Sequence, residues 1–159
     1  MPVPDLARFL LTKELKLVAT KRSRRGFVWV VQKIRQRYEI CPKCATPSKT
    51  RAGRVVSTVR DECIRSQSIW LEIHKHRYYC RRCRKRFTES VMGIWPRRRT
   101  TQRFRNSVAE RCHKATSLLS VQRDLRLSAG FTYNVFYERL EVKLNERKNA
   151  PWPKVLGID

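Results

Sequence analysis

Four cysteines stand in two matched pairs, Cys41-Pro-Lys-Cys44 and Cys80-Arg-Arg-Cys83. A two-residue spacing lets both thiolates of a pair point at one ion, while backbone N–H groups orient toward the sulfurs. Two such pairs supply the four ligands of a closed, tetrahedral structural Zn²⁺ site. The alternatives are four small buried apolar side chains or a redox pair. We expect zinc because the pairs are matched and a module this small needs the folding energy of a metal.

The other candidate ligands are expected to be bystanders. Cys63 and Cys112 have no paired cysteine, and Cys112 falls on the apolar face of a predicted helix. His74 and His76 precede Cys80, but four thiolates already satisfy the ion. We call the turn that each Cys-x-x-Cys pair forms a knuckle. Ala45 and Arg84 directly follow the two pairs, at the position where a glycine often relaxes the knuckle turn.

Charge decides which partner to expect. The 159 residues contain 37 Lys and Arg against 13 Asp and Glu, a formal net charge of +24. Such self-repulsion is relieved by a polyanion, so double-stranded DNA is the leading partner rather than a membrane or a small-molecule substrate. No segment reads as a membrane span or a secretory signal. We therefore expect a cytoplasmic, nucleoid-associated protein with reduced cysteines.

The elements that must position the cysteines are predicted to be strands. Residues 1–40 form a segment packing on the zinc module, with a short helix near Leu6–Leu11 and strands at 15–19 and 27–34. Residues 41–89 form the zinc ribbon. Within it, strands at 54–60 and 68–79 make a hairpin that returns the second cysteine pair to the first. In the second of these strands Ile69, Leu71 and Ile73 alternate with polar or bulkier neighbours.

After a basic linker at 90–99, the apolar period changes to that of helices. Residues 100–149 are predicted to form three of them. The first has an N-cap at Thr100 or Thr101 and the apolar face Phe104, Val108, Cys112 and Ala115. The second carries Val121 and Leu125 behind Ser117 or Ser120. The third starts from an N-cap at Thr132 and has the apolar face Tyr133, Phe136, Tyr137, Leu140, Leu144.

The second and third of these helices have the features of a helix-turn-helix. The polar residues of the third helix, Thr132, Asn134 and Arg139, would then face the major groove. There Asn can pair with adenine and Arg with guanine. Phosphate contacts are expected from an arginine group ahead of this module, Arg97, Arg98, Arg99, Arg103 and Arg105. The alternative for the helices is a hairpin for dimerisation, and a homodimer is compatible with both readings.

These motifs together resemble the N-terminal region of bacterial insertion-sequence transposases of the ISL-three type. The resemblance is carried by Cys41-Pro42-Lys43-Cys44, Cys80 to Cys83, Arg86-Phe87-Thr88-Glu89, the helical module and Leu156-Gly157-Ile158-Asp159. It implies recognition of terminal inverted repeats. It also implies that Asp159 matches the first of three catalytic carboxylates, which in a full-length homologue hold Mg²⁺ for phosphodiester chemistry. Residues 150–159 would be a linker and the first strand of that RNase-H-like domain, and we expect this chain alone to bind DNA without cutting it.

The sequence therefore predicts an α+β protein with three parts. They are a small β-rich zinc ribbon, an all-α helix-turn-helix module and the first strand of a catalytic domain. Two other functions stay open at this point. One is a zinc-ribbon and helix-turn-helix transcriptional regulator, or a truncated copy that represses its own element. The other is a basic zinc-ribbon RNA-binding protein.

Overall fold

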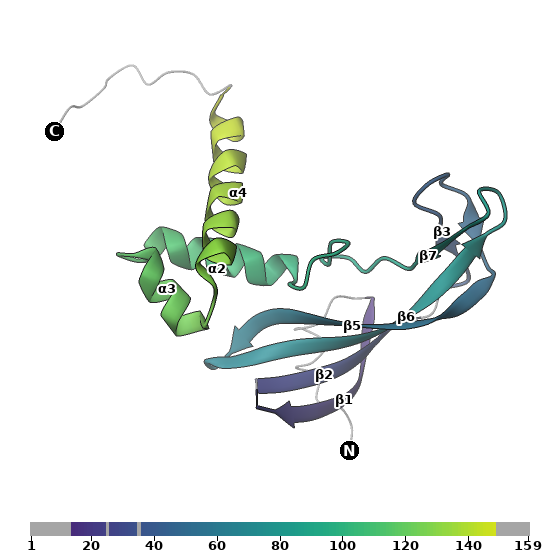
Figure 1. Cartoon of the computed structure of the whole chain (residues 1–159), viewed down its shortest axis with the longest axis horizontal. Helices are drawn as coiled ribbons and strands as arrows, with labels where there is room; N and C mark the ends of the chain where they lie inside the picture. Colours follow the sequence, from purple (N-terminus) through teal and green to yellow (C-terminus); the bar gives the residue numbers. More distant parts are fainter. Residues whose placement is uncertain (1–13, 25, 35, 149–159) are drawn as a thin grey trace. The chain divides into compact units, whose positions relative to one another are not determined.

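The computed structural model describes residues 14–24, 26–34 and 36–148 (Figure 1). The chain divides into two compact units, Met1–Phe104 and Arg105–Asp159. The first is built on a mixed β-sheet and the second is helical, which confirms the α+β class. The predicted helix at Leu6–Leu11 and the predicted strand ending at Asp159 lie outside the described residues.

The sheet of the first unit has five strands. They are β1 (Leu15–Ser23), β2 (Gly26–Lys33), β5 (Arg51–Ile64), β6 (Gln67–Cys80) and β7 (Lys85–Thr88). The order is β1-β2-β6-β5, and β7 pairs with the end of β6. Strand β2 runs parallel to β6, whereas the other pairs are antiparallel. Strands β1 and β2 of the N-terminal segment thus belong to the same sheet as β5, β6 and β7. The sheet is therefore larger than the predicted ribbon of residues 41–89.

The core of this unit follows the alternation of β6. Ile69, Leu71 and Ile73 are all at most 3% exposed and pack with Val31 and Val59. Side chains on a strand alternate between faces, so every second residue enters the core, as the sequence predicts. The intervening Trp70, Glu72 and His74 remain at least partly exposed.

The predicted hairpin is present and longer than expected. Strands β5 and β6 are 14 residues each and turn through Arg65 and Ser66, which both have positive φ. Two successive left-handed residues match the twist of a tight hairpin. A two-stranded ladder, β3 (Glu39–Ile40) and β4 (Pro47–Ser48), carries the first cysteine pair. Figure 1 shows β3 and β7 at the same end of this hairpin.

Residues 90–99, expected as a linker, pack on the first unit instead. Val91 is 3% exposed within the core, and Ile94 packs against the same cluster. Further on, the Arg60 N–H donates to the Arg99 carbonyl (2.8 Å) and the Thr101 N–H to the Arg60 carbonyl (2.9 Å). Strand β5 is an edge of the sheet, so this segment covers part of an edge that would otherwise present unpaired groups.

Three helices follow, α2 (Gln102–Lys114), α3 (Leu118–Leu125) and α4 (Ala129–Arg147). Thr101 caps α2 through its hydroxyl, which accepts from the Phe104 N–H (3.2 Å). Ser117 caps α3, as one of the two predicted residues. Most of the predicted apolar residues of α2 and α3 are buried: Phe104, Val108, Cys112, Val121 and Leu125 are 0–7% exposed. Ala115, also predicted on the face of the first helix, lies beyond the end of α2 and is partly exposed. No helix in the described part of the chain has the length and apolar content to cross a membrane.

The third helix begins earlier than predicted. Its N-cap is Ser128, whose hydroxyl accepts from the Phe131 N–H, and Ala129 and Gly130 are already helical. Only Arg126, Leu127 and Ser128 separate α3 from α4. Arg126 ends α3 in the left-handed conformation (φ 50°) that glycine usually takes at this position.

Candidate metal centre and basic surface

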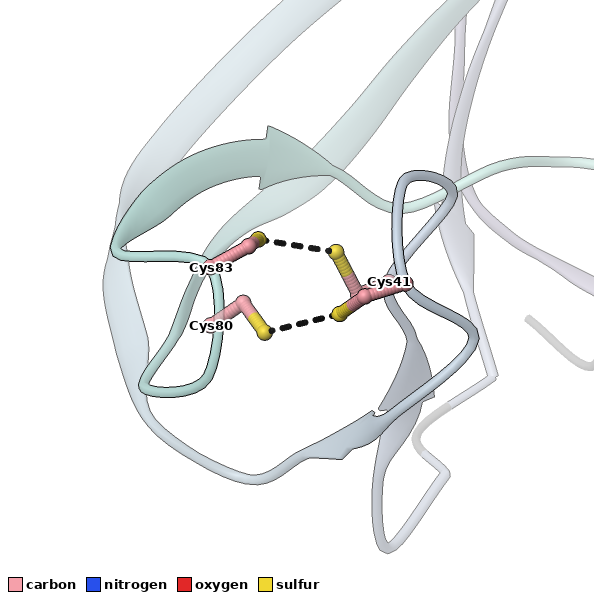
Figure 2. A group of neighbouring side chains, drawn as sticks. Cys41, Cys80 and Cys83 are labelled. Atoms are coloured by element: carbon pink, nitrogen blue, oxygen red, sulfur yellow. Dashed lines mark hydrogen bonds between the residues drawn. The ribbon is translucent and has the colours of Figure 1, made fainter.

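The two cysteine pairs meet at one end of the sheet (Figure 2). Cys41 directly follows β3 and Cys80 ends β6, and both are at most 2% exposed. The Cys41 and Cys83 sulfurs lie 3.6 Å apart, and those of Cys44 and Cys80 lie 3.5 Å apart. All four sulfurs are within 4.8 Å of one another. The separation of 35 residues between the pairs is therefore spanned as predicted.

This geometry fits a tetrahedral metal ion. With Zn–S bonds of about 2.3 Å, tetrahedral sulfurs lie about 3.8 Å apart, close to the two distances above. A disulfide needs a bond of about 2.05 Å, and all four cysteines are free. Cys63 and Cys112, predicted as bystanders, are not part of the group. The four cysteines can thus hold one metal ion, with two ligands from each knuckle.

Both knuckles carry the same backbone feature. Ala45 and Arg84, the two positions where the sequence lacks an expected glycine, each have φ 53°. In the first knuckle the Ala45 N–H donates to the Cys41 carbonyl (2.9 Å), and the Cys41 N–H donates to the Thr46 carbonyl (3.0 Å). The left-handed conformation costs a non-glycine residue free energy. The same unfavourable conformation therefore occurs at both knuckles, where the turn must direct two cysteine sulfurs toward one ion.

The thiols differ in acidity. Hydrogen bonds from Thr46 lower the pKa of Cys44 to about 6. Desolvation, with hydrogen bonding to Cys41 as the next cause, raises the pKa of Cys83 to about 11. A metal ion binds thiolates, so it must displace the protons that the less acidic thiols hold.

A dense group of cations surrounds the second knuckle. Its members, called the knuckle cations here, lie between Cys80 and the end of β7, and all are exposed: Arg81, Arg82, Arg84, Lys85 and Arg86. The rigid turn and the short strand β7 fix their backbones at one end of the sheet. Fixed backbones hold these charges together in spite of their mutual repulsion.

The buried acidic groups of the first unit have partners within the unit. Lys33 pairs with Glu39, Arg103 with Asp61, and His76 lies 3.4 Å from Glu89. Each of these carboxylates is at most 7% exposed. They therefore do little to offset the exposed cations in solvent.

Two of the five arginines expected to clamp phosphates have internal partners. Arg103 forms an ion pair with Asp61, whose Oδ1 also accepts from the Thr101 hydroxyl (2.7 Å). Arg105 is 9% exposed, pairs with Glu138 and lies over the Phe131 ring. Both guanidiniums are thus engaged within the fold, and phosphate contact by Arg103 and Arg105 stays a prediction. Arg97 and Arg99 are exposed and Arg98 is partly so.

The third helix also differs from the expectation. Thr132 is fully buried and its hydroxyl donates to the Ser128 carbonyl (3.1 Å), so it cannot reach a groove. Asn134 and Arg139 are exposed. At about 100° per residue, however, five positions separate them by roughly 140° around the helix. They therefore point to different sides of α4.

The predicted apolar face of α4 is not the buried one. Within the described residues, α4 buries Thr132 and Val135, whereas the exposed set is Tyr133 45%, Tyr137 57%, Leu140 38% and Leu144 61%. The buried side of α4 is therefore the one that carries Thr132 and Val135. The apolar residues predicted from the periodicity do share one face of α4, but most of them are exposed and do not form the buried face.

Sequence reasoning missed two residues that matter in the first unit. Asp61 is fully buried as an acceptor for Thr101 and Arg103. Its signal in the sequence was an acidic residue pair, Asp61-Glu62, inside an otherwise strand-like run of a basic chain. Trp95 is a large exposed aromatic ring within an arginine-rich segment, and that combination was its signal. Asp159, the predicted first carboxylate of a catalytic site, lies outside the described residues.

Comparison with models of known protein families, with curated proteins and with solved structures finds no match. The candidate site therefore rests on its own geometry.

Proposed function

We propose that this chain is a zinc-stabilised module that binds double-stranded DNA. One observation carries the proposal: the knuckle cations are exposed and fixed beside the four-cysteine group. Proteins bind the DNA backbone chiefly by neutralising phosphates with Lys and Arg, and they release condensed counterions as they do so. A rigid turn with adjacent cations suits that task.

Zinc is the ion that suits the ligand set best. Four thiolates in a closed tetrahedral arrangement form a structural site, since no position is left open for water or substrate. The ion would join the β3–β4 ladder to the end of β6, where each element alone is short. Its role is therefore to hold the turn that presents the cations.

The wider identity rests on the motif resemblance. We propose that the module is the DNA-binding part of an insertion-sequence transposase of the ISL-three type and recognises terminal inverted repeats. In this proposal α3 and α4 form a helix-turn-helix. Their short connection supports it, since such motifs join their helices by three or four residues. Of the predicted base-reading residues, Asn134 and Arg139 remain candidates, one on each side of α4.

The test compares two variants that each lose three positive charges, one at the second knuckle and one elsewhere on the first unit. Replacing Arg81, Arg82 and Arg84 by alanine removes three exposed cations at the knuckle. The control replaces Lys16, Arg22 and Arg24, which are exposed on or beside β1. Affinity for a random duplex is measured by fluorescence anisotropy over a salt series, with zinc content checked in each protein.

We expect the knuckle variant to bind weakly, with a salt slope smaller by roughly 0.9 for each lost phosphate contact. The control should keep the slope of the wild-type protein. Equal losses in both variants would show that net charge alone attracts DNA, and the proposal of a knuckle interface would be wrong.

A further inference from the structure

A hollow of about 620 Å³ lies in the first unit beside residues 94–99. Its walls come from β5, the end of β7 and the arginine-rich segment, and they include Ser57, Thr58, Lys75, Trp95, Arg97 and Arg99. Pockets for small organic ligands span roughly 300–1,000 Å³, so the hollow has the size of a ligand site. Pro42 of the first knuckle also lines it, so the hollow adjoins the metal centre.

The segment that forms one wall is fixed at both ends. Val91 is buried in the core before it, and after it the backbone of Arg99 accepts from Arg60 on β5. Between these points, the Arg98 N–H donates to the Trp95 carbonyl (3.2 Å), and Arg97 is left-handed with φ 63°. Strained residues persist where the surroundings over-determine them, and they gather at binding sites.

Trp95 is exposed and yet held in place. Its side chain is 58% exposed. The indole Nε1 donates to Gln102 Oε1 (2.9 Å), and the Arg98 guanidinium lies 5.9 Å from the ring centroid. An oriented aromatic ring at the surface is a platform on which a nucleic-acid base can stack.

The charge of the hollow is positive. Lys75, Arg97, Arg98 and Arg99 line it, and burial lowers the pKa of the Lys75 ammonium. Glu89 is the acidic residue among the described lining residues. Its Oε1 accepts from the His76 N–H (2.7 Å), so this carboxylate is already engaged by β6. The lining thus offers an aromatic ring, hydroxyl groups and several cations, the combination that a nucleotide uses.

We propose that this hollow takes one unpaired nucleotide of the bound DNA, with its base on Trp95 and its phosphate against Arg97 and Arg99. The inference rests on the proposed DNA binding. A strand neutralised by the knuckle cations can reach the hollow, because Thr88 at the end of β7 lines it and Lys85 and Arg86 belong to the same strand. The hydroxyl of Ser57, on the same face of β5 as the lining residues Val55 and Val59, can bond to the edge of the base.

The experiment compares two labelled duplexes that differ by a single unpaired thymidine in the middle of one strand. Zinc-loaded wild-type protein should bind the bulged duplex more tightly. Trp95→Ala should lose on the order of 5- to 100-fold on the bulged duplex, the range measured for one stacked base. It should leave the affinity for the paired duplex unchanged. Tyr38→Ala removes a comparably exposed aromatic ring (47%) from the same unit and should change neither affinity.

Two further readouts guard against misfolding. Trp95→Phe keeps a ring and should recover most of the preference for the bulge. An unpaired 2-aminopurine should lose fluorescence on binding to the wild-type protein and not on binding to Trp95→Ala.

Equal affinity of the wild-type protein for both duplexes would overturn the inference and leave the proposed function standing. If thymidine monophosphate displaces the bulged duplex at concentrations near its own Kd, the hollow is a mononucleotide site and the inference is wrong. Failure to bind either duplex would overturn the proposed function and this inference together.

Discussion

Replacing Ala45 by glycine should stabilise the first knuckle. Ala45 has φ 53°, and holding a non-glycine residue in that conformation costs about 1–2 kcal/mol. Glycine removes the cost but makes the unfolded chain freer, which lowers stability by about 0.4–1 kcal/mol. The difference spans about 0–1.6 kcal/mol, with a midpoint gain of about 0.8 kcal/mol in the free energy of unfolding. For a unit of this size that corresponds to a rise in Tm of roughly 2–8 °C.

The assay is thermal unfolding of the zinc-loaded protein, followed by circular dichroism in the strand region. Ala19→Gly is the matched control, because Ala19 is an exposed residue of β1 and has no positive φ. Glycine within a strand costs roughly 0.5–1 kcal/mol, so this control should lower Tm. If Ala45→Gly lowers Tm as much as Ala19→Gly does, the left-handed knuckle turn is not a source of strain and the argument from φ fails.

Three further changes test other parts of the first unit. Cys80→Ser should reduce bound zinc well below one ion per chain by atomic absorption, whereas Cys63→Ser should retain it, because Cys63 is outside the four-cysteine group. Asp61→Ala should lower the free energy of unfolding in urea by about 1.5–3 kcal/mol, because the Thr101 hydroxyl and the partly exposed Arg103 guanidinium lose their shared acceptor; a loss under 1 kcal/mol would contradict this. Gly26→Ala should prevent native pairing of β2 with β6, because a Cβ there would lie 2.1 Å from the Ser68 carbonyl oxygen. Gly53→Ala, also at positive φ but with no neighbour within 4 Å, should be milder, and equal effects would show that dihedral strain rather than contact decides.

The strands and the four-cysteine group could be predicted because their signals are local. The alternation of Ile69, Leu71 and Ile73 defines the buried face of β6 without any knowledge of its neighbours. The two-residue spacing in each Cys-x-x-Cys pair likewise indicates that both of its sulfurs can face one ion. A hairpin is the simplest way to bring the two pairs together. What the sequence could not show is that β2 joins β6 in parallel, since strand pairing between distant segments leaves no mark in either segment.

The features that the sequence did not show are those that tertiary contacts decide. Arg103 and Arg105 look like other arginines of a basic run until Asp61 and Glu138 are placed beside them. Thr132 and Ser128 are equally good N-cap residues, and choosing the later one shifted the expected start of α4. Thr132 is also fully buried rather than on the exposed side of α4.

The salt dependence of duplex binding tests the central claim most directly. Zinc-loaded protein is titrated with a labelled duplex from low to moderate salt, and structured RNA is added as competitor at one salt concentration. With about six phosphates contacted, log affinity should fall against log salt with a slope near −5, and RNA should compete poorly. A flat salt response, or competition by RNA equal to that by duplex DNA, would contradict a zinc-held cation surface that binds double-stranded DNA.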